Sequence, residues 1–135
     1  CMSAESKKAH NFIQSLIEDA IAKGEHTGKV VTRFPPEPNG YLHIGHAKAM
    51  HFDFGVAAKF QGNTYLRFDD TNPAAEKQEY IDSILSSVSW LGHRPFKVTY
   101  SSDYFGQLHE FAVKLIKLGK AYVCHQAKAE VTASR

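Results

Sequence analysis

The stretch that decides the fold reads Lys29-Val30-Val31-Thr32-Arg33-Phe34-Pro35-Pro36-Glu37-Pro38-Asn39-Gly40-Tyr41-Leu42-His43-Ile44-Gly45-His46. Residues 29–34 are rich in β-branched side chains and stop at prolines, which predicts a β-strand. The prolines and the Asn-Gly pair that follows force a turn, because proline fixes φ and lacks an N–H donor. A helix is expected to begin near Leu42. The stretch therefore predicts a strand, a tight loop and the N-terminus of a helix.

This helix N-terminus is expected to bind an anion. The first N–H groups of a helix lack internal partners, and the aligned peptide dipoles place about +0.5 charge there, so the backbone alone is expected to hold a phosphate. His43 and His46 stand three residues apart, which puts both imidazoles on one side of the helix. Gly45 has no Cβ, so a flat ligand such as a purine can approach the backbone there. The pattern predicts a site for a nucleoside triphosphate.

Two other interpretations of the histidine pair stay open. A His-x-x-His pair can ligate a metal, although the helical zinc motif spaces its histidines four apart and adds a third ligand. No Glu or Cys stands in register near this pair. The two residues can also be exposed histidines at a helix cap. The strand and the proline-rich loop that precede them favour the nucleotide site over both alternatives.

The segment His43-Ile44-Gly45-His46 is identical to the HIGH signature of class I aminoacyl-tRNA synthetases. Residues 33–48 resemble the subgroup of glutaminyl and of archaeal or eukaryotic-type glutamyl enzymes. Arg67-Phe68-Asp69-Asp70-Thr71-Asn72-Pro73 is similar to a second stretch of that subgroup. Residues 37–40 and 100–105 look more like the glutaminyl than the glutamyl enzymes. The resemblance extends from about residue 11 to residue 122.

The resemblance implies a reaction in two steps. The carboxylate of L-glutamine attacks the α-phosphate of ATP, which brings Mg²⁺ with it, and the glutaminyl group then passes to tRNA(Gln). It implies that His43 and His46 are catalytic donors to phosphate, and that Arg33 and Asp69 bind the charged groups of the amino acid. The other residues that it assigns to the ATP pocket are Glu37, Pro38, Asn39, Ile44, Gly45, Ala47, Lys48 and Ala49.

Several parts of that family have no counterpart in these 135 residues. They are the KMSKS signature, the second half of the nucleotide fold, the insertion that grips the acceptor stem and the anticodon-binding region. We therefore expect a fragment of the catalytic domain that is incomplete for the full reaction. A glutamyl-tRNA synthetase fragment and a noncatalytic binding module on the same fold are the alternatives.

The rest of the chain predicts alternating strands and helices. Apolar stripes of helical period indicate helices over 6–23, 42–60, 75–91 and 101–119, and shorter apolar runs indicate strands over 29–34, 64–68, 96–100 and 121–124. This alternation predicts an α/β fold, the first half of a doubly wound parallel sheet (Rossmann-like, HUP-type) with an N-terminal helix. The expected divisions are a helical extension over 1–27, the half-domain over 28–124 and an unassigned tail over 125–135.

Individual side chains also carry expectations. Asp69 and Asp70 follow the second strand, and neighbours in extended backbone point to opposite sides. Asp69 can therefore face a ligand while Asp70 is structural and helps to start a helix. Ser101 or Ser102 is expected to cap the last long helix, and Trp90 is expected to pack against the protein.

Composition adds limits to these assignments. The chain has the length of one domain, 43% hydrophobic residues and a net charge of +2, which is too small to indicate nucleic-acid binding. Cys1 and Cys124 form neither a metal-ligand spacing nor a disulfide framework, as is typical of a reducing compartment. There is no apolar run of about 20 residues and no layout of a signal peptide. We therefore expect a cytoplasmic protein with no membrane partner.

Overall fold

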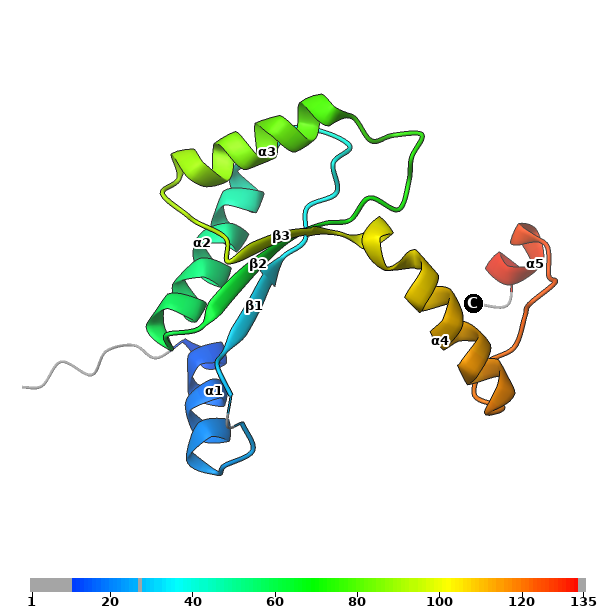
Figure 1. Cartoon of the computed structure of the whole chain (residues 1–135), viewed down its shortest axis with the longest axis horizontal. Helices are drawn as coiled ribbons and strands as arrows, with labels where there is room; N and C mark the ends of the chain where they lie inside the picture. Colours follow the sequence, from blue (N-terminus) through cyan, green and yellow to red (C-terminus); the bar gives the residue numbers. More distant parts are fainter. Residues whose placement is uncertain (1–10, 27, 134–135) are drawn as a thin grey trace, which may run out of the picture.

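The computed structural model describes residues 11–26 and 28–133, so Cys1 and the first five residues of the expected N-terminal helix lie outside the described part. Figure 1 shows the elements in chain order. They are α1 (Phe12–Ala22), β1 (Val31–Phe34), α2 (Ile44–Lys59), β2 (Asn63–Phe68), α3 (Gln78–Trp90), β3 (Lys97–Tyr100), the 3₁₀-helix η1 (Ser101–Tyr104), α4 (Phe105–Lys117) and α5 (Lys128–Ala133).

The three strands form a parallel sheet in the order β1-β2-β3. Leu66 at the centre of β2 stands opposite Phe34 of β1 and Val98 of β3. Each pair of strands is joined through a helix, α2 or α3, as parallel strands require. The predicted parallel α/β fold is therefore confirmed. Because the strands are parallel, their three carboxyl ends lie at the same edge of the sheet.

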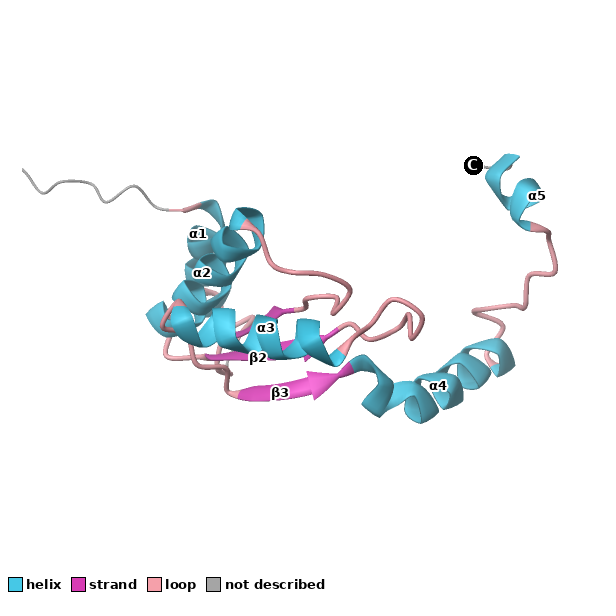
Figure 2. Ribbon diagram, turned by 90° about the horizontal axis from the view of Figure 1, so that it is seen from above, coloured by secondary structure: helices cyan, strands magenta, loops and turns pink. Residues whose placement is uncertain are grey.

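The core lies on the sheet face that α2 and α3 cover (Figure 2). In β2, Thr64, Leu66 and Phe68 are buried and alternate with half-buried Tyr65 and Arg67, because successive side chains of a strand point to opposite faces. The buried cluster combines strand and helix residues, namely Phe34, Met50, Phe54, Leu66, Phe68, Ile84 and Val88. Burial of this apolar surface holds both helices on the sheet.

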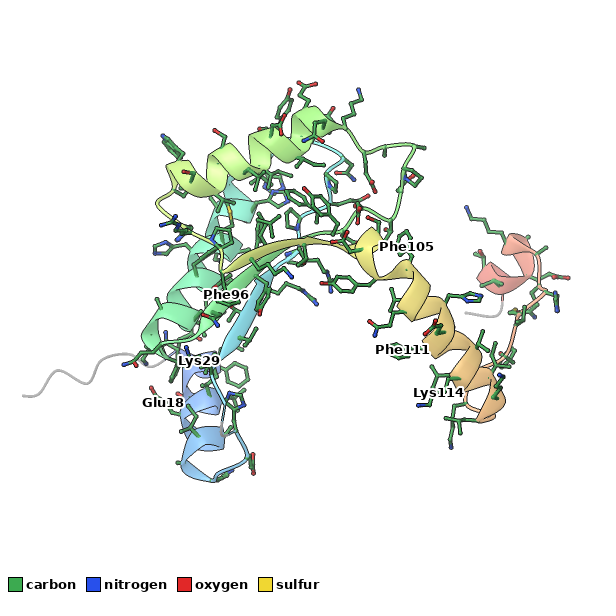
Figure 3. All side chains as sticks on the ribbon, viewed as in Figure 1. Glu18, Lys29, Phe96, Phe105, Phe111 and Lys114 are labelled. Carbon is green, nitrogen blue, oxygen red and sulfur yellow. The ribbon has the colours of Figure 1, made fainter. Side chains whose placement is uncertain are left out.

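The N-terminal helix α1 lies beside β1 and α2 as an amphipathic helix, but none of its residues is buried, so the expected packing on the body is slight. The Lys59 ammonium at the end of α2 forms an ion pair with Glu18 at 2.9 Å and donates a hydrogen bond to Gln14 at 3.0 Å. Figure 3 shows Glu18 on α1. Residues of α1, β1 and α2 together line a hollow of about 400 Å³. One side of α1 therefore faces the body of the protein, while Phe12 is 71% exposed.

Two helices begin later than the sequence predicts. The helix expected from Leu42 starts at Ile44, and the helix expected from 75 starts at Gln78. In front of α3 the chain forms a turn, in which the Glu76 carboxylate accepts a hydrogen bond from the Asn72 N–H at 2.6 Å. Glu76, which was expected inside the first turn of the helix, thus bonds back to the loop before it.

The C-terminal part departs most from the sequence prediction. The strand predicted over 121–124 is wrong, because residues 121–127 form neither helix nor strand and Tyr122 is 85% exposed. A strand needs a neighbouring strand to pair with, and α4 leads the chain away from the sheet (Figure 1). The short helix α5 carries no pattern that predicted it. Trp90, expected to pack, is 84% exposed.

The helix α4 presents an uncovered apolar side. None of its residues is buried, although the sequence has the apolar stripe that was expected. Figure 3 shows Phe105, Phe111 and Lys114 on this helix, away from the sheet. The large apolar side chains along the helix are 43% to 53% exposed, and they are Phe105, Leu108, Phe111, Leu115 and Ile116.

Candidate nucleotide-binding site

The proline-rich loop between β1 and α2 is fastened to the next two elements. Pro36 and Pro38 are buried, and their carbonyls accept hydrogen bonds from the Asp69 N–H at 2.9 Å and the Lys77 N–H at 3.3 Å. Asp69 directly follows β2, and Lys77 directly precedes α3. The prolines cannot donate hydrogen bonds themselves, so the loop is held through its carbonyl groups. This attachment fixes where the N-terminus of α2 lies.

The two histidines cap that N-terminus with their ring nitrogens. His43 is the N-cap, and its Nδ1 accepts a hydrogen bond from the Gly45 N–H at 3.0 Å. The Nδ1 of His46 accepts in turn from the His43 N–H at 3.1 Å. The ring centroids are 4.0 Å apart. The structure therefore brings this predicted pair together, in the arrangement of a capping box in which imidazoles replace the usual Ser and Glu.

This cap decides which atoms remain for a ligand. An imidazole nitrogen that accepts from an N–H has no proton, so both neutral rings carry their proton on Nε2. The expectation that backbone amides alone would hold a phosphate needs correction, because the N–H groups of His43 and Gly45 already donate to imidazoles. The helix tip instead offers two Nε2–H donors. They supplement the positive end of the helix dipole.

Burial and the neighbouring imidazole of His43 lower the pKa of His46 below its usual value. His46 therefore stays neutral near pH 7, which is the state that its hydrogen bond to the His43 N–H requires. His43 itself is exposed, and its ring borders a hollow of about 230 Å³ between the start of α2 and the end of α3. Ile44 at the rim of this hollow is 86% exposed.

The two carboxylates that follow β2 have different hydrogen-bond partners. Asp70 accepts hydrogen bonds from the Ser102 N–H at 2.9 Å and from the Ser102 hydroxyl, so it fastens the end of β2 to η1. Asp69 is half-buried, and its carboxylate accepts only a long hydrogen bond of 3.5 Å from the Ser101 hydroxyl. Asp69 thus keeps acceptor capacity for a ligand cation.

Two serines do not have the predicted capping role. Neither Ser101 nor Ser102 caps α4, because η1 begins at Ser101 and Tyr100 is its N-cap. The Asp103 carboxylate closes this turn by accepting from the Tyr100 N–H at 3.1 Å. Ser102 is instead the partner of Asp70. The 3₁₀ turn leaves the serine hydroxyls free to bond to the loop after β2.

Arg33 lies on the sheet face opposite the core, because its neighbours Thr32 and Phe34 point toward α2. Its side chain is exposed and borders the hollow beside α1. Asp53 of α2 borders the same hollow. Burial raises the pKa of Asp53, and the charge of Arg33 partly offsets that rise. Arg33 and His43 therefore border different hollows.

The remaining predicted ATP-pocket residues surround the helix tip. Pro38 is buried and Ala47 is half-buried, whereas the others, Glu37, Asn39, Ile44, Gly45, Lys48 and Ala49, are exposed. In the described part of the chain, no three His, Cys, Asp or Glu side chains gather as a metal site would require. None of the helices in residues 11–26 and 28–133 has the length and apolar character that crossing a membrane demands.

One contact at this site could not be foreseen from the sequence. The Tyr41 hydroxyl donates a hydrogen bond to the Glu79 carboxylate of α3. Glu79 sits among charged residues at the start of a helix, a pattern that indicates only a solvated surface. The two residues are 38 positions apart, so only the fold brings them together.

Comparison with known proteins identifies relatives of this chain. Residues 29–135 match the family described as tRNA synthetases class I (E and Q), catalytic domain. A probable glutamine–tRNA ligase of Dictyostelium discoideum is 66% identical over 108 residues, which are 80% of this chain and 14% of the relative. A glutamine–tRNA ligase of Pseudomonas aeruginosa is 52% identical over 132 residues, which are 97% of this chain and 24% of the relative.

Solved structures show the same fold. A glutamate–tRNA ligase from Elizabethkingia meningosepticum, crystallised in complex with its amino acid, superposes with a TM-score of 0.71 at 23% identity. The superposition covers 80% of this chain and 23% of that one. At this identity the likeness concerns the fold alone. Against the curated relatives, the chain spans about a seventh to a quarter of their length.

Proposed function

The chain belongs to the class I tRNA synthetases of the glutamate and glutamine group, and from this membership we propose that it is part of a glutamine–tRNA ligase. Relatives with 52% to 66% identity that carry this name support glutamine over glutamate. The proposed half-domain for ATP and amino acid comprises residues 28–124, preceded by the helical extension over 1–27 and followed by the segment 125–135. The observation that carries the proposal is the donor pair at the tip of α2.

The chemistry needs little covalent work from the protein. A carboxylate oxygen of glutamine attacks the α-phosphorus of ATP and pyrophosphate leaves, which gives glutaminyl-adenylate. A ribose hydroxyl of tRNA(Gln) then attacks the acyl carbon and AMP leaves. Both steps depend on aligned reactants and on donors that bind the phosphate oxygens better as charge develops in the transition state.

The proposed phosphate donors are the Nε2–H groups of His43 and His46. Their Nδ1 atoms are held by backbone N–H groups at 3.0 and 3.1 Å, so the rings need not reorganise when a phosphate arrives. The loop residues Glu37 to Asn39 and the first turn of α2 through Ala49 would border the nucleotide. Magnesium would enter with the triphosphate, whose oxygens are the ligands that this ion prefers.

The proposed amino-acid contacts are Asp69 and Arg33. Asp69 is the natural partner for the α-ammonium group, because a carboxylate binds a cation strongly and this one has only a long bond to Ser101. Arg33 would bind a carboxylate or amide oxygen of the amino acid. Both residues lie at or near the carboxyl ends of neighbouring parallel strands, where open α/β sheets bind ligands.

The first experiment measures ATP binding to this chain by calorimetry, with and without Mg²⁺. Wild type is expected to bind ATP, and His43→Ala and His46→Ala are each expected to weaken binding about tenfold, the value of one hydrogen bond to a charged group. His109→Ala on exposed α4 is the matched control and should bind as wild type does. Failure of wild type to bind ATP, or equal binding by all four proteins, would count against the site.

The second experiment tests the amino acid. Residues 28–124 would replace the corresponding part of the Pseudomonas aeruginosa glutamine–tRNA ligase, which is 52% identical. ATP–pyrophosphate exchange that depends on glutamine and is lost in Asp69→Asn is the expected result. Exchange with glutamate alone would reject the proposed substrate, and glutamine-dependent exchange unaffected by Asp69→Asn would reject the role of that residue.

A further inference from the structure

The loop that leads into α2 is attached to the rest of the protein at three successive points. The first two are the carbonyls of Pro36 and Pro38, which accept from backbone N–H groups next to β2 and α3. The third is the side chain of Tyr41, whose hydroxyl donates to Glu79 in the first turn of α3. Tyr41 comes two residues before the N-cap His43. Of the three hydrogen-bonded attachments, it is thus the one nearest to the histidine pair, next to Leu42, which packs against the core.

The contact between Tyr41 and α3 involves more than one hydrogen bond. The Tyr41 ring meets the Tyr80 ring edge to face, with centroids 5.2 Å apart and planes at 89°. The Tyr80 ring in turn lies 5.8 Å from the Lys77 ammonium, measured to the ring centroid. The edge-to-face arrangement is the one that aromatic rings prefer, because the positive edge of one ring meets the negative face of the other. Together these contacts give Tyr41 one preferred orientation although it is 61% exposed.

Glu79 also favours the protonated state of Tyr41, which the contact needs. The hydrogen bond to Glu79, with some burial and the charge of the carboxylate, raises the pKa of the Tyr41 hydroxyl. A tyrosine hydroxyl is protonated throughout the neutral range in any case, and the raised pKa extends its donor state to higher pH. Glu79 itself sits in the first turn of α3, where the helix dipole favours an anion.

Leu42 and Ala47 pack against the core on the inner side of the α2 tip, whereas its outer side has no such packing and depends on the Tyr41 attachment. His43, Ile44 and Gly45 are all exposed. The two imidazoles are oriented by backbone N–H groups of residues 43 and 45, so a shift of that backbone moves both rings. The direction in which the chain enters α2 therefore sets the direction of both Nε2–H groups.

We propose that Glu79 is a positioning residue for the His43–His46 donor pair, and that it acts by holding Tyr41 and with it the entry of the chain into α2. This inference rests on the proposed function, because it assigns Glu79 to the nucleotide site of the same enzyme. Glu79 reduces the number of orientations that the two donors adopt before ATP binds.

The test compares wild type with Glu79→Ala, Glu79→Gln and Tyr41→Phe, and uses Asp82→Ala as the matched control. Asp82 lies one turn further along α3 and accepts a hydrogen bond from Gln78 of its own helix, at 2.9 Å. Glu79→Gln keeps an acceptor for the Tyr41 hydroxyl, and Tyr41→Phe keeps the ring. Melting temperatures establish that every variant is folded.

Two readouts report on the tip itself, namely ¹⁵N NMR signals of the His43 and His46 rings and hydrogen exchange of the Gly45 amide. In Glu79→Ala and Tyr41→Phe we expect Gly45 exchange to accelerate about tenfold and the ring signals to lose the pattern of a single Nε2–H tautomer. Glu79→Gln should restore most of both, and Asp82→Ala should match wild type. Unchanged exchange and ring signals in Glu79→Ala would overturn the proposal.

The third readout is ATP affinity by calorimetry. We expect a loss of about threefold to tenfold in Glu79→Ala with partial recovery in Glu79→Gln. If exchange and ring signals change but ATP affinity does not, the positioning role is overturned and only a structural contact remains. If wild type itself binds no ATP, the proposed function fails, whereas the ring signals and exchange still decide whether Glu79 orients the pair.

Discussion

Asp70 and Ser102, 32 residues apart, join the ends of two neighbouring strands through two hydrogen bonds to one carboxylate. Asp70 lies just beyond β2, and Ser102 lies in the turn just beyond β3. The parallel register places the end of β2 beside the end of β3, so the pair closes the sheet at the edge where the candidate site lies. Asp70 is thus occupied by Ser102, whereas the neighbouring Asp69 accepts only the long bond from Ser101 and remains available for a ligand.

Removal of this carboxylate should loosen the edge of the sheet. We expect Asp70→Ala to lower the free energy of unfolding by about 1 kcal/mol, since both bonds are largely exposed. Ser102→Ala should cost less, because it removes the hydroxyl and keeps the backbone N–H donor. Chemical denaturation of the two variants measures both values. Equal stability of Asp70→Ala and wild type would show that the contact contributes nothing in solution.

The same pair predicts a response to acid. Burial acts to raise the pKa of Asp70, but the hydrogen bonds from Ser102 outweigh it and hold the pKa below its usual value. A carboxylate with a lowered pKa in the folded state contributes stability above its unfolded pKa of about 3.9. That contribution is lost as the pH falls through the lower folded value. Denaturation curves between pH 5 and 2 should therefore converge for wild type and Asp70→Asn.

The imidazole cap predicts a second response, at higher pH. The pKa of His46 is lowered by burial and by His43, so the unfolded chain binds a proton first as the pH falls below about 6.5. Stability should therefore decline from pH 6.5 downward until the folded His46 also protonates. His46→Gln should reduce this decline, because glutamine at this position accepts the same N–H without titrating.

His93 contributes to the same acid response and supplies an internal comparison. Its ring stacks on Phe54 at 4.5 Å, and burial followed by the nearby His51 lowers its pKa. Melting temperatures at pH 7.5 and 5.5 for wild type, His46→Gln and His93→Phe separate the two contributions. An equal drop in wild type and His46→Gln would assign the whole effect to other groups.

Gly45 and Gly55 in the same helix offer a matched pair of substitutions. A Cβ at Gly45 would lie 2.8 Å from Cε1 of His43, whereas a Cβ at Gly55 meets nothing within 4 Å. We expect Gly55→Ala to stabilise the protein by about 0.5 to 1 kcal/mol with no change in ATP affinity. Gly45→Ala should displace the His43 ring and weaken ATP binding about tenfold. Denaturation and calorimetry on both variants provide the measurement.

The uncovered side of α4 predicts a difference between two aliphatic residues of similar size. Ile84 in α3 is fully buried, and Ile84→Ala should cost about 2 to 5 kcal/mol. Leu115 in α4 is 47% exposed, and Leu115→Ala should cost less than about 1 kcal/mol. Leu115→Lys should in addition reduce association at high protein concentration, as light scattering can measure. A cost at Leu115 as large as that at Ile84 would mean that α4 packs in solution.

The sequence predicted those features that depend on local patterns. The β-branched run before the prolines predicted β1, and the prolines with the Asn-Gly turn predicted a helix start within two residues of the observed one. The apolar alternation in β2 is visible in the residues themselves, and it matches the buried side chains. Such signals lie within a few neighbouring positions, where steric preference and hydrophobic period determine the outcome.

The features that the sequence did not predict depend on distant partners. Nothing near Glu79 indicates that Tyr41 will contact it, and nothing near Ser102 indicates Asp70. The stripe in α4 correctly indicated a helix, but a stripe does not reveal whether a neighbour covers it. The predicted strand at 121–124 is wrong because a short apolar run forms a strand only where it can pair with the edge strand of a sheet. The run itself does not reveal whether such an edge lies nearby.

The lone pairs on Nδ1 of His43 and His46 point toward backbone N–H groups, and this has a consequence for purification. A nickel or cobalt resin binds histidine through a ring nitrogen that carries a free lone pair, and in His43 and His46 that nitrogen is turned toward the backbone. Binding of the metal by His43 or His46 would require these hydrogen bonds to break, so any retention of an untagged chain should come from its other six histidines. Two histidines one turn apart should thus behave toward transition metals as if they were absent, while still attracting oxyanions.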